Sequence, residues 1–140
     1  MLDIYLKECL YFTSSRISRI ITKMAEEEFL KSGLSPTAAY LLMVIYENEG
    51  ISQKQIGGIL HLQPSTVTRI VEKLMAKGLV YNNVEGRLSL IFTTDKGKEL
   101  EAIIHVCWNS LRERYSEIIG KDLADELSLK LELLSNELEK

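Results

Sequence analysis

Four apolar side chains recur at helical spacing in the middle of the chain: Val67, Ile70, Val71 and Leu74. This spacing places them on one face of a helix, which predicts that the face is buried. Pro64 suits the first turn of such a helix, and Gly78 suits the left-handed position that follows its last turn. The residues between the apolar positions then face outward: Ser65, Thr66, Thr68, Arg69, Glu72 and Lys73.

A second, shorter helix is predicted directly before it. Ser52 and Gln55 have the spacing of a capping box, and Ile51 and Ile56 have that of a hydrophobic staple. We therefore expect a helix over Gln53–Leu60.

Only residues 61–63 join the two helices, so they are expected to cross steeply in a helix-turn-helix. Glycine costs about 1 kcal/mol relative to alanine inside a helix, which implies a packing reason for Gly57. Close approach of the second helix at Gly57 is the simplest one.

Two β-prone runs follow, over Leu79–Asn83 and Leu88–Thr93, around a turn at Val84–Arg87. This pattern predicts a β-hairpin, which beside a helix-turn-helix forms a wing. Arg87 would suit a narrow minor groove, where negative potential attracts guanidinium groups. The alternative is a surface arginine paired with Glu85.

The outward residues of the second helix have the chemistry of a nucleic-acid contact. Short hydroxyl groups near a helix N-terminus can bond phosphates or base edges, and arginine can bind guanine through two hydrogen bonds. The alternative is that they only cap and solvate the helix. The candidate DNA-binding residues are Lys54, Gln63, Ser65, Thr66, Thr68, Arg69, Lys73 and Arg87, with Lys77 as a further phosphate contact.

Charge is distributed unevenly along this chain of 140 residues with net charge −3. Residues 51–98 hold seven Lys/Arg against three Asp/Glu, whereas the remaining residues hold ten against seventeen. Phosphate affinity depends on the local patch, so the middle of the chain can attract DNA while the flanks repel it.

The flanks carry long apolar helical patterns. One runs from Tyr5 to Leu30, and another runs from Lys96 to a stop at Gly120. The last helix repeats leucine at Leu123, Leu127, Leu131, Leu134 and Leu138, with Leu129 and Leu133 outside that stripe. Since it is apolar on more than one side, we expect a second copy of the protein to cover it in a twofold dimer.

The order of several motifs resembles the MarR family of winged-helix transcription regulators. The motifs are Leu34-Ser35-Pro36, Ile51-Ser52, Ile56-Gly57, Ser65 to Val71, Lys77 to Val80, Arg87 and Thr94 to Gly97. The resemblance implies a mainly α (α+β) fold over 1–140, with a DNA-binding winged part at 34–94 and dimerisation helices at 1–33 and 95–140. It places Ser65, Thr66, Thr68 and Arg69 on the recognition helix and Arg87 on the wing, where Glu85 replaces the family's aspartate.

The resemblance further implies a homodimeric transcriptional repressor that binds double-stranded DNA at a pseudo-palindromic operator. The two half-sites of that operator should lie one helical turn (~34 Å), or a multiple of it, apart. Family members often bind small aromatic effectors between the dimer helices and the winged part. The aromatic candidates here are Tyr11, Phe12, Tyr40, Tyr46 and Trp108, which are otherwise core residues.

We considered three alternatives to an effector-responsive DNA-binding protein: a peroxide sensor, a metal sensor and a protein-interaction module. Cys9 lies in a segment similar to that of the peroxide-sensing branch, but the tyrosines of that branch are missing near residues 34–39, which favours inert thiols at Cys9 and Cys107. His61 and His105 are too far apart to predict a metal site. A winged helix can also serve as a protein-interaction module.

Enzymatic motifs are absent, so neither catalysis nor a cofactor is expected. No run approaches the roughly 20 apolar residues of a membrane span, and the N-terminus does not resemble a signal peptide, so we expect a cytoplasmic protein.

Overall fold

A computed structural model describes all residues from Met1 to Lys140. Its elements are α1 (Leu2–Lys7), α2 (Leu10–Glu28), the 3-10 helix η1 (Phe29–Ser32), α3 (Pro36–Glu47), β1 (Ile51–Ser52), α4 (Gln53–Leu60), α5 (Pro64–Ala76), β2 (Val80–Glu85), β3 (Leu88–Thr93), α6 (Asp95–Glu99), α7 (Glu101–Ile119) and α8 (Lys121–Leu138). The fold is mainly helical with one small antiparallel sheet, as predicted.

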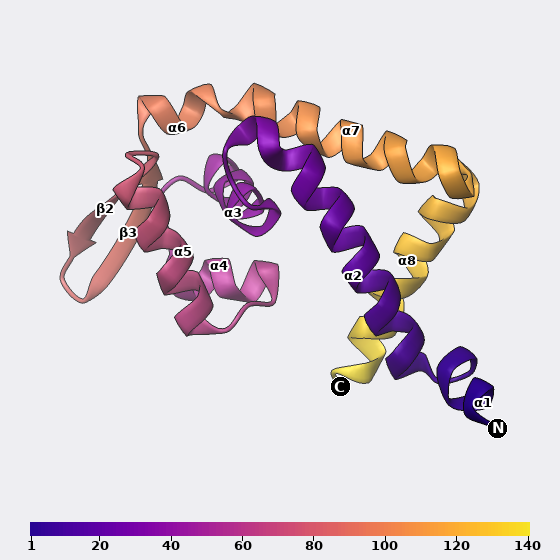
Figure 1. Cartoon of the computed structure of the whole chain (residues 1–140). Coiled ribbons are helices and arrows are strands. Elements are labelled where there is room, and N and C mark those ends of the chain that lie inside the picture. The colour runs from indigo at the N-terminus through magenta and orange to yellow at the C-terminus, as the bar shows by residue number, and fades with distance from the viewer.

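The chain forms two arms joined by α7 (Figure 1). One arm holds α3, α4, α5 and the β2–β3 hairpin, and the other holds α1, most of α2 and α8, with both chain termini near its end. The long helix α7 packs against η1, α2 and α8, so it connects the flanking helices to the winged arm.

Local sequence explains the elements of the winged arm. Ser52 accepts a hydrogen bond from the Gln55 backbone while the Gln55 side chain bonds back, so the predicted capping box and the start of α4 are confirmed. Ser35 likewise caps α3 by accepting from the Ala38 N–H, with Pro36 in the first turn. The predicted buried face of α5 is also confirmed, because its four apolar side chains are at most 8% exposed.

The sheet has a third strand that the sequence pattern did not indicate. Residues of β1 pair with β3, Ile51 opposite Ile91 and Ser52 opposite Leu90, which gives the strand order β1-β3-β2. The hairpin strands are also longer than expected, since Val84 and Glu85 belong to β2 and only Gly86 and Arg87 form the turn. Gly86 has a φ of 61°, as the first position of a two-residue type II′ turn requires.

The long flanking helices are interrupted where periodicity alone predicted continuity. The helix expected from Tyr5 to Leu30 is divided into α1 and α2, because Cys9 takes an extended conformation (φ −91°, ψ 121°) at the N-cap of α2. After α6, Leu100 marks the break before α7. Gly120, with a φ of 92°, ends α7 at the predicted stop and lets α8 turn back.

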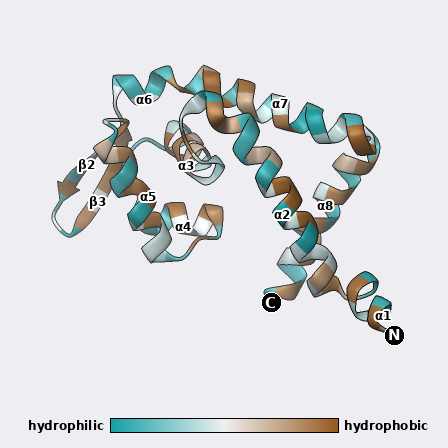
Figure 2. Cartoon of the chain, in the orientation of Figure 1, coloured by the Kyte–Doolittle hydropathy of each residue, from teal (hydrophilic) through white to brown (hydrophobic).

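Apolar side chains are exposed along the second arm. Figure 2 shows hydrophobic segments on α1, α2 and α8 away from the winged arm. Those on α8 are all between 46% and 74% exposed: Leu123, Leu129, Leu131, Leu133, Leu134 and Leu138. None of the helices combines the length and hydrophobicity needed to cross a lipid bilayer.

Candidate nucleic-acid interface

A tight turn sets the angle between α4 and α5. His61 ends α4 in the left-handed conformation (φ 55°), and the Leu62 N–H donates to the Gly57 carbonyl oxygen at 3.0 Å. A Cβ at Gly57 would lie 3.1 Å from the Leu62 oxygen and 3.4 Å from Cγ2 of Val67. The tight approach at Gly57 therefore comes from the backbone of the turn, whereas the second helix, which was predicted to approach closely, is at ordinary van der Waals distance through Val67.

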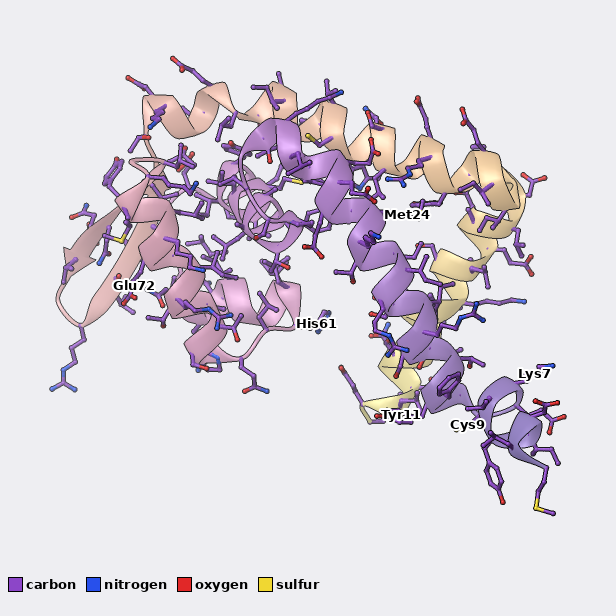
Figure 3. All side chains as sticks on the ribbon, viewed as in Figure 1. Lys7, Cys9, Tyr11, Met24, His61 and Glu72 are labelled. Carbon is purple, nitrogen blue, oxygen red and sulfur yellow. The ribbon has the colours of Figure 1, made fainter.

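The exposed side of α5 has a centre and two edges, because successive side chains rotate by about 100°. Opposite the buried face lie Ser65, Arg69 and Glu72, all exposed. Figure 3 shows Glu72 on α5, pointing away from the winged core. Thr66 is only half-buried and Arg69 is exposed, so neither lies in the packed interior. This side therefore presents hydroxyl, guanidinium and carboxylate groups outward.

One edge of α5 lines a groove of about 370 Å³ beside the start of α3. The side chains of Thr66, Arg69, Lys73 and Lys77 line it from α5. The Lys77 ammonium donates a hydrogen bond to the Gly33 carbonyl oxygen at 3.4 Å, which ties this edge to the segment that precedes α3. Three cations thus lie along one side of α5 at intervals of four residues.

The other edge of α5 faces α4. The Thr68 hydroxyl donates to the side-chain oxygen of Gln53 at 2.9 Å and also lies 3.0 Å from the Pro64 carbonyl oxygen. Gln53 was not singled out from the sequence, since the first residue of a short helix carries no signal of a contact fifteen positions away. The structure therefore adds Gln53 to the candidate surface.

No cation of the winged arm is paired with a carboxylate. All six ion pairs join residues of the flanking helices, such as Arg114 with Glu28 at 3.0 Å and Arg112 with Asp125 at 2.9 Å. Lys54, Lys73 and Arg69 are exposed and belong to no ion pair. The positive charge counted in the sequence is therefore available to an external anion.

The wing ends in an exposed arginine. Arg87 forms no ion pair, so the alternative pairing with Glu85 does not occur in the structure. The Ser89 hydroxyl bonds across the hairpin to the Asn82 side-chain oxygen. Tyr81 and Phe92 stack with ring centroids 5.4 Å apart, which stiffens the hairpin nearer its base.

The base of the wing is held by polar side chains. The Glu49 carboxylate accepts hydrogen bonds from the Thr93 N–H at 2.8 Å and from the Thr93 hydroxyl at 2.5 Å.

Gln63, the N-cap of α5, is exposed and makes no capping bond, so its amide faces solvent at the start of that helix.

A small, mostly apolar cavity of about 230 Å³ lies between the two arms. It is lined by Ala25, Phe29, Pro36, Thr37, Tyr40, Leu60, Leu62 and Leu111. Of the five aromatic candidates named from the sequence, only Tyr40 lines it. Burial raises the pKa of Tyr40, and the neighbouring Trp108 side chain partly offsets this rise in pKa. Tyr11 and Phe12 occupy the first turn of α2 and do not line this cavity, as the position of Tyr11 in Figure 3 illustrates.

The two cysteines and two histidines lie on separate elements. Cys9 is half-buried before α2, whereas Cys107 is buried within α7, and both are free. In Figure 3, His61 projects from the end of α4, far from Cys9. No group of three His, Cys, Asp or Glu side chains is arranged to hold a metal ion.

Part of the chain is similar to a known protein family. Residues 32–85 match the model of the MarR family. The HTH-type transcriptional regulator TtmR of Methylorubrum extorquens (strain PA1) is 39% identical over 64 residues, which are 44% of this chain and 33% of that protein. The chain thus matches about a third of this curated relative's length.

Solved structures share the fold over almost the whole chain. CouR from Rhodococcus jostii RHA1 bound to p-coumaroyl-CoA has a TM-score of 0.78 at 23% identity, covering 92% of this chain and 93% of that one. The transcriptional repressor CouR bound to a 23-mer DNA duplex has a TM-score of 0.86 at 20% identity, covering 95% and 96%. At these identities the likeness establishes the fold.

The matched segment runs from the end of η1 through α4, α5 and β2, so it contains the helix-turn-helix and the first strand of the wing. The family model, the curated relative and the shared fold agree with the motifs read from the sequence. Residues 32–85 thus match the MarR family model, and the chain as a whole shares the fold of the solved CouR structures.

Proposed function

We propose that this protein is a sequence-specific regulator that binds double-stranded DNA through α5. The observation that carries the proposal is the exposed side of α5, where Ser65 and Arg69 face outward in an arm whose cations have no carboxylate partners. Hydroxyl and guanidinium groups in the first two turns of a recognition helix can reach base edges in the major groove.

The positions on α5 suggest different roles for its side chains. Ser65 and Arg69 lie at the centre of the exposed side and Thr68 lies on the edge that faces α4, and all three are assigned to base edges. Lys73, on the edge beside α3, is assigned to phosphates, together with Thr66 and Lys77 of the same groove and with Lys54 of α4 and Gln63 at the start of α5. Arg87 at the wing tip is assigned to the adjacent minor groove or its phosphates.

The functional unit is proposed to be a twofold dimer. The winged part at 34–94 would bind DNA, and the helices within 1–33 and 95–140 would hold the two copies together. Exposed leucines along α8, together with Ile17 and Ile20 on α2, supply the apolar surface that such a dimer would bury. Two copies of α5 would then read a pseudo-palindromic operator, with half-sites about one helical turn apart or a multiple of it.

Regulation is proposed to be repression that a small aromatic effector relieves. The support is the apolar cavity beside Tyr40, which lies between α3 of the winged arm and α2 and α7. A ligand there would touch both arms, and CouR, which shares the fold, has been solved with p-coumaroyl-CoA and with DNA. About 230 Å³ suits a single aromatic ring rather than a whole coenzyme A ester.

Salt dependence tests the proposed DNA binding. The affinity for duplex DNA should fall steeply as log[salt] rises, because each neutralised phosphate releases counterions. Arg69→Ala should cost about 1–3 kcal/mol on a selected operator and relax its base preference, whereas Lys73→Ala should weaken all duplexes similarly and reduce the salt slope by about one. A module that binds only proteins would show no salt-dependent duplex binding at micromolar concentration.

A further inference from the structure

The contact between Gln53 and Thr68 links the two helices of the helix-turn-helix through side chains alone. Among the hydroxyl residues of α5, Thr68 is the one that bonds to another element. The contact lies at the surface, since Thr68 is exposed and Gln53 is half-buried. It is therefore next to the side of α5 that is proposed to face bases.

Two acceptors hold the Thr68 hydroxyl in one orientation. Threonine in a helix divides between two rotamers, one of which allows a bond to the carbonyl oxygen four residues earlier. That oxygen, on Pro64, lies 3.0 Å away, but it is also the acceptor for the helical N–H of Thr68. The Gln53 oxygen at 2.9 Å is the additional acceptor, and it favours the observed rotamer.

The orientation has a chemical consequence for recognition. A hydroxyl group has one proton and two lone pairs. When Thr68 gives its proton to Gln53, it can offer only lone pairs to a base. In the major groove the hydrogen-bond donors are the amino groups of adenine and cytosine, whereas guanine and thymine present carbonyl oxygens at the corresponding positions.

We propose that Gln53 is a positioning residue for base recognition: it holds Thr68 as a hydrogen-bond acceptor, so that Thr68 selects a base with an exposed amino group, adenine or cytosine. This inference rests on the proposed DNA binding and deepens it. Gln53 acts through Thr68, so its effect should fall on one base pair of each half-site and not on overall affinity.

A double-mutant cycle on the full-length protein tests this role. A pool of duplexes with a randomised centre is first enriched on the wild-type protein. The affinities of the enriched duplex and its single-base-pair variants are then measured by fluorescence anisotropy for wild type, Gln53→Met, Thr68→Val and the double variant. Methionine keeps the length of glutamine without its acceptor, and valine keeps the shape of threonine without its hydroxyl.

We expect Gln53→Met, Thr68→Val and the double variant to lose the same base-pair preference. Each single variant should lower discrimination at the same base pair by about three- to tenfold, the size of one hydrogen bond, and the double variant should lose no more than either single variant. Gln53→Glu, which keeps a side-chain acceptor, should retain this preference while it weakens binding to every duplex by adding a negative charge. Thermal unfolding of each variant checks that the fold is intact.

Several results would overturn the inference while leaving the proposed function standing. One is an unchanged base-pair preference in Gln53→Met. Another is an equal loss of affinity for every duplex, which would indicate a phosphate contact. The third is that the two substitutions act independently at different base pairs. If the wild-type protein enriches no sequence and binds no duplex, the proposed function itself fails, and the inference fails with it.

Discussion

Gly97 of α6 lies directly against the backbone of Leu79, the residue before β2: a Cβ at Gly97 would be 2.1 Å from the Leu79 carbonyl oxygen. The same junction contains a hydrogen bond of 2.5 Å from the Tyr46 hydroxyl to the Gly97 carbonyl oxygen. Thr94 caps α6 by accepting from the Gly97 N–H, and its hydroxyl donates to the Gly78 oxygen at 2.6 Å. The start of the wing is thus fastened to α6, which leads into α7.

Substitution of Gly97 by alanine should destabilise the fold. No movement of a flexible side chain can relieve the clash, because the opposing atom belongs to the backbone. We expect Gly97→Ala to lower the free energy of unfolding by about 1–3 kcal/mol, measured by chemical denaturation.

Gly58 provides the matched control for this change. It lies inside α4, has no atom within 4 Å of an added Cβ and has no positive φ. Gly58→Ala should therefore raise stability by about 0.5–1 kcal/mol through helix propensity. Equal stability of the two variants would contradict the close packing at Leu79.

Tyr46 should make stability depend on alkaline pH. Burial, followed by the negative charges of Glu101 and Glu49, raises the pKa of Tyr46 from 10.0 to about 12. Between these values the unfolded chain loses the phenolic proton and the folded protein keeps it, so the free energy of unfolding should fall as pH rises from about 10 towards 12. Below pH 10 this contribution is fully present.

The measurement compares Tyr46→Phe with wild type over this pH range. Phenylalanine cannot donate to Gly97, so the variant should be less stable at neutral pH by about 0.5–1.5 kcal/mol. The variant should also lack the part of the fall in the free energy of unfolding between about pH 10 and 12 that Tyr46 causes. Parallel stability curves for the two proteins would show that Tyr46 does not titrate as proposed.

A charge on the leucine stripe of α8 should separate the proposed dimer. Leu131 is 52% exposed in the single chain, so Leu131→Glu should leave the subunit folded while it opposes burial of that surface. Sedimentation velocity should then report monomers and a lower affinity for a two-half-site duplex. Ser128→Glu adds the same charge away from the leucine stripe and should leave the dimer intact, whereas a wild-type monomer would contradict the dimer directly.

A ligand in the cavity beside Tyr40 should alter the fluorescence of Trp108, the one tryptophan in the chain. Trp108 neighbours Tyr40, so a ring bound in the cavity beside Tyr40 would change the surroundings of the tryptophan. Titration with p-coumarate, a single-ring probe, should change the emission of the wild-type protein and lower its affinity for DNA. Ala25→Leu extends a side chain that lines the cavity, so this variant should lose both responses. A response that persists in Ala25→Leu would place the probe elsewhere.

The helix-turn-helix could be predicted almost residue by residue, whereas the interruptions of the long helices could not. The bounds of α4 follow from Ser52, Gln55 and the short turn, because capping bonds join residues three positions apart. The break at Cys9 has no comparable signal, since apolar periodicity continues on both sides of it. Periodicity identifies the face that is buried but does not detect an extended residue between two helices.

The other features that could not be predicted from the sequence are contacts between positions far apart in the chain. The residues near Ile51 do not predict that it pairs with Ile91 as part of a third strand. Its spacing to Ile56 already suits a hydrophobic staple, so the pattern was explained without a strand. Among the candidate residues, the outward positions of Ser65 and Arg69 follow from helical rotation. The bond from Thr68 to Gln53 depends on how α5 docks against α4.

The sequence by itself determined the identity and ends of the central helices, the exposed side of α5 and the concentration of positive charge around it. These properties depend on caps, turns and side-chain periodicity, which act within a few residues. Only the tertiary structure decided which edge of α5 faces α4, why residue 97 must be glycine and where a cavity opens beside Tyr40. Those features depend on distances between segments that lie far apart in the chain, and such distances exist only once the apolar faces have packed together.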